Sequence, residues 1–116
     1  MQLKRLCDEN KHLYNDAIAL YESAFPIEER RPQKEQARVM NKDAYHFDLI
    51  MQGEEFLGVM LYWETDTFIF LEHFTTLPRL RGRGFGAKAL DLLKAKGKTV
   101  ILEIEAPVDE MTTRRY

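Results

Sequence analysis

The 116-residue sequence has few of the features expected of a secreted or membrane-bound protein. Its one cysteine, Cys7, cannot form an internal disulfide and lies in an apolar stretch, so we expect a buried thiol in a reducing, cytoplasmic setting. Apolar runs such as Phe68–Leu71 are far too short to span a bilayer, and the first residues lack the apolar segment of a signal peptide. No membrane association is therefore expected.

The sequence also lacks a net positive charge and a cluster of metal ligands. The formal net charge of −2 disfavours a nucleic-acid-binding role. The three histidines are scattered without ligand spacing, so no metal site is predicted. Some of the positive charge is concentrated, because Arg79, Arg81 and Arg83 lie within five residues of each other. Such a local positive site favours a small anionic ligand over a polymer.

The length fits one domain, residues 1–116, and the hydrophobic spacing divides it into helices and strands. Apolar residues recurring from Tyr14 to Phe25 predict a helix ending near Ala24, and Pro32 opens a second helix that runs to Met40. Further elements are expected at Leu3–Cys7, Tyr45–Met51, Phe56–Trp63, Thr67–Phe74 and Thr99–Ile104 (strands) and at Gly84–Lys96 (helix). The predicted order is β-α-α-β-β-β-α-β, an α+β fold with a mixed sheet whose last step is parallel.

The segment Leu77–Ala87 carries the clearest chemical signal. Glycines at 82, 84 and 86 lie between a strand and a helix, where they permit positive φ and close approach of a ligand to the backbone. The first amides of the helix lack intrahelical partners and lie at its positive dipole end. Together with the arginines they predict a phosphate-binding loop, although a plain helix-start turn with solvated arginines is the alternative.

A dinucleotide-binding site is a remote alternative for the same segment. Gly82, Gly84 and Ala87 match the fingerprint G-x-G-x-x-G/A, and Glu103 lies about 20 residues further on, where a ribose-binding acid belongs. That fingerprint requires its first glycine at the end of a strand, whereas seven residues separate Phe74 from Gly82. The preceding strands also read as an antiparallel meander, which argues against this alternative.

The pattern Arg81-x-x-Gly84-x-Gly86 resembles the R/Q-x-x-G-x-G/A signature of GNAT acetyltransferases. The element order and the apolar strand before Pro78 are also similar to that family. The resemblance implies a GNAT-like sheet with helices on both faces, from which the family's C-terminal helix and strands are missing here. On that expectation the segment Val100–Glu105 would be an open sheet edge through which a homodimer could form.

The resemblance further implies that the chain binds acetyl-CoA. The loop amides would hold the pyrophosphate, and the backbone at the end of the preceding strand would hold the pantetheine arm. The cofactor-binding residues implied are Phe74, Thr75, Thr76, Arg81, Gly82, Arg83, Gly84, Phe85, Gly86 and Ala87.

Family members often carry a general base on the same strand, nine residues before the signature arginine, which is Glu72 here. Strict alternation places Glu72 on the same side as Phe70 and Phe74, and His73 on the opposite side with Leu71. The alternative for Glu72 is a structural ion pair with a lysine or arginine.

The resemblance implies transfer of an acetyl group to a primary amine, on a small molecule or a protein, by direct attack in a ternary complex. Residues expected to border the amine are Glu28, Glu29, Arg30 and Tyr62, although a solvated loop and a core tyrosine are the alternatives. The tyrosine that protonates the leaving thiolate in relatives has no match. The alternative function is a non-catalytic acyl-CoA-binding or interaction module.

Overall fold

The computed structural model describes residues 1–102, apart from the side chain of residue 33. The strands are β1 (Gln2–Arg5), β2 (Tyr45–Gln52), β3 (Glu55–Glu64), β4 (Phe68–Thr76) and β5 (Thr99–Leu102). The helices are α1 (Tyr14–Ala24), α2 (Gln33–Val39) and α3 (Phe85–Lys94), with 3₁₀ turns η1 (Asp8–Leu13) and η2 (Pro78–Leu80). The predicted element order is confirmed, while the predicted end of the last strand and the expected open edge at 100–105 lie partly outside the described residues.

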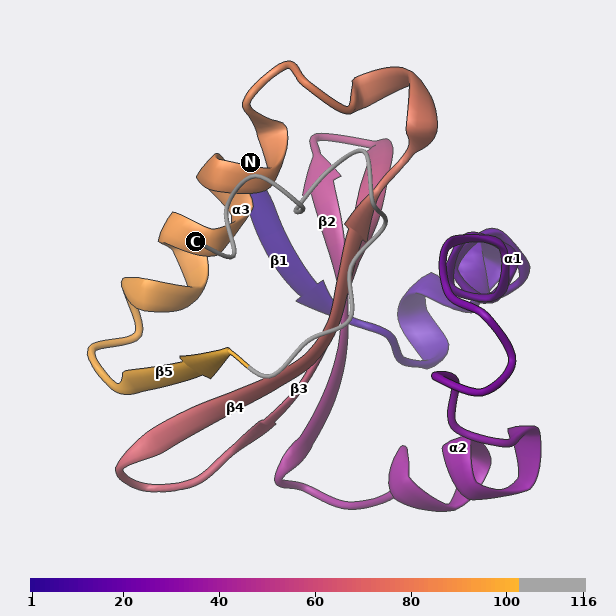
Figure 1. The fold of residues 1–116 in the computed structure, drawn as a ribbon, viewed down its shortest axis with the longest axis vertical. Helices are drawn as coiled ribbons and strands as arrows, with labels where there is room; N and C mark the ends of the chain where they lie inside the picture. Colours follow the sequence, from indigo (N-terminus) through magenta and orange to yellow (C-terminus); the bar gives the residue numbers. More distant parts are fainter. Residues whose placement is uncertain (103–116) are drawn as a thin grey trace.

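The five strands form one mixed sheet in the order β1-β2-β3-β4-β5. Strands β1 to β4 are antiparallel neighbours, and β4 pairs with β5 in parallel through the crossover helix α3. A parallel pair requires such a crossover because its two strands start at the same end of the sheet. Helices α1 and α2 cover one face of the sheet and α3 covers the other, as the resemblance implied (Figure 1).

Each face of the sheet has its own hydrophobic core. On the α1 face, Leu20, Tyr21 and Phe25 pack against buried side chains of β2 and β3. On the α3 face, Ala89 and Leu93 pack against buried residues of β3 and β4, including Ile69, Leu71 and Phe74. Residues of β3 alternate between the two cores, so this central strand is apolar on both faces.

A β-bulge at Glu72 changes the phase of β4. Leu61 of β3 pairs with His73, and the next residue, Tyr62, pairs with Leu71, so Glu72 is an extra residue in the ladder. Leu71 belongs to the α3 core, whereas both Glu72 and His73 contact residues of the α1 side. The predicted alternation was therefore wrong beyond Glu72: His73 lies on the same face as Glu72, and Phe74 lies on the α3 face.

The sheet is closely packed at Gly58 of β3. A Cβ atom there would lie 2.4 Å from the carbonyl oxygen of Thr75 and 2.9 Å from the Cα of Thr76. Both distances are shorter than real Cβ contacts, so any larger side chain would push β4 away at its C-terminal end. Glycine at this position therefore positions the end of β4, from which the glycine-rich loop begins.

Strand β1 ends at Arg5, before the predicted end at Cys7, and a 3₁₀ turn lies between it and α1. Residues Asp8–Leu13 form the 3₁₀ turn η1 and α1 begins only at Tyr14, because the Asn10 side chain binds the backbone of Arg5 and Cys7. Cys7 itself is exposed, so the expectation of a buried thiol was wrong. None of the helices in the described part of the chain combines the length and apolar character needed for a membrane span.

Candidate functional site

The loop between β4 and α3 has the geometry expected of an anion-binding turn. Gly82 and Gly84 adopt φ of 79° and 83°, a left-handed conformation that favours glycine, and Gly84 is the N-cap of α3. Backbone hydrogen bonds in this loop use the amides of Arg81, Arg83 and Lys88. The described residues provide no backbone acceptor for the amides of Gly82, Gly84, Phe85, Gly86 and Ala87. These amides lie at the positive end of the α3 dipole, so the loop can bind a phosphate group.

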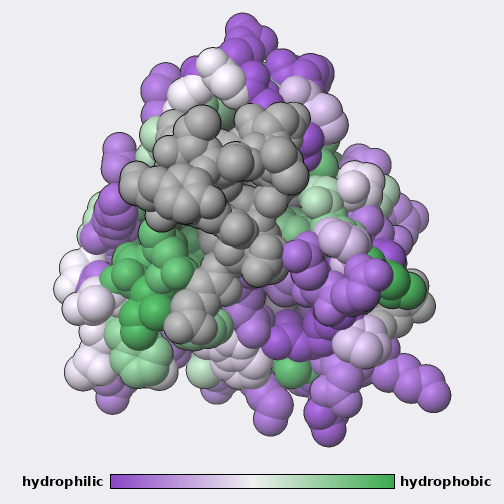
Figure 2. Space-filling view, in the orientation of Figure 1, coloured by the Kyte–Doolittle hydropathy of each residue, from purple (hydrophilic) through white to green (hydrophobic). Residues whose placement is uncertain are grey.

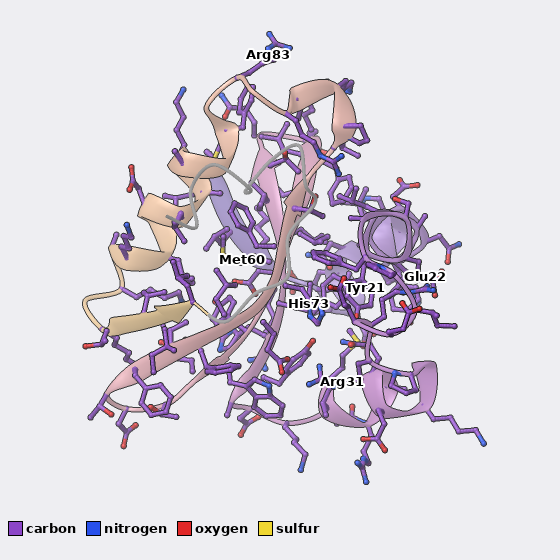
Figure 3. The ribbon with its side chains drawn as sticks, in the orientation of Figure 1. Tyr21, Glu22, Arg31, Met60, His73 and Arg83 are labelled. Atoms are coloured by element: carbon purple, nitrogen blue, oxygen red, sulfur yellow. The ribbon has the colours of Figure 1, made fainter. Side chains whose placement is uncertain are left out.

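The three arginines of this region do not act as one cluster. Arg81 turns back toward the sheet, and its Nη2 donates to the Thr75 Oγ1 at 3.1 Å. Arg83 is exposed at the far end of the molecule and lies over the Phe85 ring (Figure 3). Arg79 forms an exposed ion pair with Glu55 at 3.2 Å. Arg81 thus fastens the loop to β4, while Arg83 remains exposed for contact with an anion.

The end of β4 can offer mainly backbone groups to a ligand. The side chains of Phe74, Thr75 and Thr76 are all buried, with exposed fractions of 2%, 0% and 1%. The parallel register of β4 with β5 is described from Phe68↔Thr99 to Leu71↔Leu102. Whether β5 diverges from β4 further on, as the resemblance implies, lies outside the described residues.

Glu72 projects from the bulge toward the connector between α1 and α2. Its two carboxylate oxygens accept hydrogen bonds from Arg31 Nη2 at 2.9 and 3.1 Å. Burial lowers the pKa of Arg31, but the hydrogen bond and the charge of Glu72 outweigh this and raise it overall. The Glu72 side chain keeps 22% of its surface exposed, so it remains accessible to a ligand despite the ion pair.

His73 connects the same strand to the same connector. Its Nε2 lies 2.8 Å from the carbonyl oxygen of Glu29, which can only accept, so Nε2 carries the proton. The ring packs edge-on against Tyr21 and Phe25 at 5.1 and 4.9 Å between centroids. Burial in this aromatic setting lowers the pKa of His73, which favours the neutral ring. The histidine therefore holds the connector against β4.

The predicted amine-side residues are only partly brought together. Glu29 and Arg30 lie in the connector beside β4 and α1, where Arg30 pairs with Glu22 at 3.7 Å, and Glu28 is exposed. Tyr62 lies on the other face of the sheet, fully buried, and donates to Asp48 at 2.6 Å. The bulge explains the separation, since Tyr62 pairs with Leu71 on the α3 side.

A groove of about 750 Å³ lies between α1, the connector and α2. The residues that line it are Tyr14, Asn15, Ile18, Tyr21, Glu22, Ile27, Arg30, Arg31, Pro32 and Gln36. Arg31 belongs to this lining and also binds Glu72, so the inner end of the groove adjoins β4. Tyr21, Glu22 and Arg31 lie together on this side of the sheet, while Met60 lies on the opposite side (Figure 3).

Sequence patterns did not identify Arg31, His73 or Gln36 as parts of this site. Arg31 meets Glu72 across 41 residues, and His73 meets Glu29 across 44. Such contacts depend on how α1, α2 and β4 pack, which local patterns do not determine. The sequence did indicate a charged connector between two predicted helices, which includes Glu28, Glu29 and Arg30.

The dinucleotide-binding alternative does not fit this geometry. The 3₁₀ turn η2 separates β4 from Gly82, so the glycine does not follow a strand directly. The strands before it are antiparallel, and the described sheet has a single parallel step. Residues 1–102 also contain no group of three histidine, cysteine or acidic side chains that could hold a metal ion.

The profile of the acetyltransferase (GNAT) family matches residues 10–114. The putative acetyltransferase YjbC of Bacillus subtilis (strain 168) is 35% identical over 91 residues, covering 77% of this chain and 44% of that protein. The chain thus spans less than half the length of this curated relative.

Solved structures agree with this match. A putative GNAT-family acetyltransferase from Bacteroides thetaiotaomicron has a TM-score of 0.84 at 29% identity, covering 99% of this chain and 66% of that one. The structure of AAC(6')-Iy with the bisubstrate analogue CoA-S-monomethyl-acetylneamine has a TM-score of 0.60 at 13% identity, covering 98% and 84%. The latter likeness concerns the fold alone.

Proposed function

Because the chain belongs to the acetyltransferase (GNAT) family, we propose that it is an N-acetyltransferase that transfers an acetyl group from acetyl-CoA to a primary amine. The observation that carries the proposal is the loop at Gly82–Ala87, with two left-handed glycines and a row of helix-start amides. AAC(6')-Iy, a fold neighbour, was solved with a CoA-containing bisubstrate analogue, which supports the same ligand class here.

In this proposal the loop amides and the α3 dipole bind the pyrophosphate of acetyl-CoA. Backbone groups at the end of β4 bind the pantetheine arm, because the side chains of Phe74–Thr76 are buried. Arg81 holds the loop against β4 through Thr75, and the exposed Arg83 adds charge for the phosphates. Acetyl-CoA supplies the activated thioester, and the setting that we expect is the cytoplasm.

The amine is proposed to attack the thioester directly in a ternary complex. It must first lose a proton, and Glu72 is the proposed proton acceptor because its partly exposed carboxylate lies beside the groove-lining Arg31. The acetyl group is proposed to go to an amine on a small molecule or a protein, and neither nucleic acid nor a membrane is proposed as a partner. A homodimer through the β5 edge remains a prediction.

The two-point ion pair of Glu72 with Arg31 favours a second candidate, an acyl-CoA-binding module without turnover. Both candidates share the loop, so CoA binding alone does not separate them. The test is thiol release from acetyl-CoA in the presence of a panel of primary amines, with calorimetric titration of CoA on the same sample. Turnover supports the transferase; tight CoA binding without thiol release for any amine supports the binding module.

A further inference from the structure

The groove between α1, the connector and α2 contains two buried polar atoms without partners among the described residues. Gln36 is only 4% exposed; its Nε2 donates to Tyr45 at 2.9 Å, while its Oε1 receives no hydrogen bond. Arg30 Nε likewise has no acceptor. One atom is an acceptor and the other a donor, and buried groups of this kind destabilise a protein unless they are paired.

Both atoms belong to residues that line the groove, so a ligand there can pair with them. Because both atoms are buried, their side chains must rotate for a ligand in the groove to reach them. The terminal torsion of a glutamine amide is broad, so this adjustment is easy for Gln36. A ligand that offers an N–H to the first atom and a carbonyl to the second would satisfy both. A single amide group has this combination.

The rest of the groove wall is mostly apolar. Ile27 is 74% exposed and Tyr14 is 41% exposed, so both side chains are accessible to a ligand in the groove that they line. The apolar and aromatic residues of the lining are Tyr14, Ile18, Tyr21, Ile27 and Pro32. They suit a ligand with an aliphatic or aromatic side chain of its own.

The charge of the lining argues against a polycation. Arg30 and Arg31 contribute two guanidinium groups, whereas Glu22 is the one acidic side chain in the lining. That carboxylate is already paired with Arg30. Arg31 is paired with Glu72 in the same way. A polyamine or an aminoglycoside, which carries several ammonium groups, would therefore find each carboxylate among the described residues of the groove and its inner end already bound by an arginine.

We propose that the groove binds the acceptor as an α-amino amide with an apolar side chain, that is, a peptide N-terminus or a small amino-acid amide. The inference rests on the proposed acetyltransferase function, because Arg31 joins the groove to Glu72, where the amine would be used. The apolar side chain lies on the Tyr14–Ile27 wall, and the amide pairs with Gln36 and Arg30.

Calorimetric titration of the chain saturated with CoA tests this directly. The ligands are phenylalaninamide, phenethylamine (the same amine without the amide) and spermidine. Phenylalaninamide should bind about tenfold more tightly than phenethylamine, the effect expected of one or two hydrogen bonds, and more tightly than spermidine. Equal affinities for the first two, tighter binding of spermidine, or no binding of the amide would each overturn the proposal.

Two variants locate the binding. Ile27→Glu places a carboxylate on the exposed wall without disturbing the core, and should move the preference about tenfold toward spermidine. Gln52→Glu adds the same charge at the exposed last residue of β2, outside the groove lining, and should change neither preference. Gln36→Met should abolish the advantage of the amide, with circular dichroism as the check on folding. If Ile27→Glu does not change the preference between amide and spermidine, and Gln36→Met does not change the advantage of the amide over phenethylamine, the ligand does not bind in this groove.

Two further comparisons identify the source of the α-amino amide and separate the groove inference from the acetyltransferase proposal. Tighter binding of the peptide Phe-Ala-Gly-Gly than of phenylalaninamide supports a peptide N-terminus, and equal binding supports a small amide. If CoA binds but the amide does not, the groove inference fails and the acetyltransferase proposal stands. If the amide binds but thiol release never occurs, the acetyltransferase proposal fails instead.

Discussion

Three side chains fasten the connector between α1 and α2 to β4. Arg31 binds Glu72 through its guanidinium, and its backbone N–H donates to the Tyr21 hydroxyl at 2.7 Å. His73 binds the Glu29 carbonyl from the neighbouring position on β4. Glu72 and His73 are successive residues of β4, so the connector is held at two neighbouring points. The groove wall depends on these contacts.

Glu72→Gln separates a role as base from a role as anchor. If Glu72 accepts the amine proton, the variant should lower kcat/KM by about 10²–10⁴-fold, while the affinity for CoA stays the same. The acidic limb of the pH–rate profile should then disappear. Arg31→Gln is the matched control, since it breaks the same ion pair but keeps the carboxylate. An equal loss in both variants, with unchanged pH profiles, would assign Glu72 to anchoring alone.

His73 makes stability depend on pH. Its pKa is lowered in the folded chain, so the unfolded chain binds more protons as the pH falls. Above about pH 6.5, the pKa of histidine in the unfolded chain, His73 is neutral in both states and does not lower the free energy of unfolding. Below that pH the free energy of unfolding decreases by up to about 1.4 kcal/mol per pH unit, until His73 is also protonated in the folded chain. The nearby charged groups are Glu72, which opposes the shift, and Arg31, which adds to it.

Urea unfolding at pH 7.5 and pH 5.0 measures this dependence. His73→Gln can still donate to the Glu29 carbonyl but does not titrate, so its free energy of unfolding should change less between the two pH values. His12→Gln, at an exposed position, should behave like the unmodified chain. A wild-type pH dependence that persists in His73→Gln would show that another group is responsible.

At the scale of elements, the glycine-rich loop is the clearest case for a test by substitution. Gly84→Asp puts a carboxylate next to the helix-start amides and forces an L residue into φ 83°, so it should weaken CoA binding by tenfold or more. Arg79→Ala should have an effect of about twofold or less, because Arg79 is exposed and paired with Glu55. Calorimetric titration of CoA provides both numbers.

Gly97→Asp is the matched control for that experiment. Gly97 also has positive φ, 80°, but it follows the C-terminal end of α3, away from the loop. It should therefore lose stability without losing CoA affinity. If Gly84→Asp and Arg79→Ala weaken CoA equally, the pyrophosphate does not lie where we propose.

Gly58 links the sheet to the loop. Gly58→Ala should destabilise the fold by about 1–3 kcal/mol, because the new methyl group meets the Thr75 carbonyl oxygen, and it should also weaken CoA binding by displacing the end of β4. Gly53→Ala, in an open turn, should reduce stability through its φ of 60° alone. Unfolding and CoA titrations distinguish them; unchanged CoA affinity in Gly58→Ala would contradict the coupling.

The sequence predicted the elements far better than it predicted which face each side chain occupies. Periodicity located α1, α3 and the three longer strands to within a few residues, because each has an amphipathic or buried pattern. It did not reveal the bulge, since Phe70 to Phe74 reads equally well with or without an extra residue. The extra residue in β4 puts His73 on the α1 face and Phe74 on the α3 face, the reverse of the predicted arrangement.

At the scale of the whole molecule, the proposed site draws on both faces of one sheet. The proposed phosphate loop continues into α3 on one face of the sheet (Figure 1), and the groove is lined by residues of α1, the connector and α2 on the other. The end of β4 lies between them, so cofactor and amine would approach from opposite sides.

Hydrophobic side chains also gather on the surface where α3 and β5 lie, including the exposed Ile101 and Leu102 (Figure 2).

The single tryptophan has a consequence of another kind. Trp63 packs edge-on against Tyr45 at 4.9 Å, and the Arg31 guanidinium lies 6.0 Å from its ring. Its fluorescence therefore originates beside Arg31, a connector residue that lines the groove and binds Glu72 of β4. Any movement of Arg31 changes the electric field at the indole and hence the colour and intensity of the emitted light. The intrinsic fluorescence of the chain can therefore report, without an added label, whether a bound ligand changes the position of Arg31.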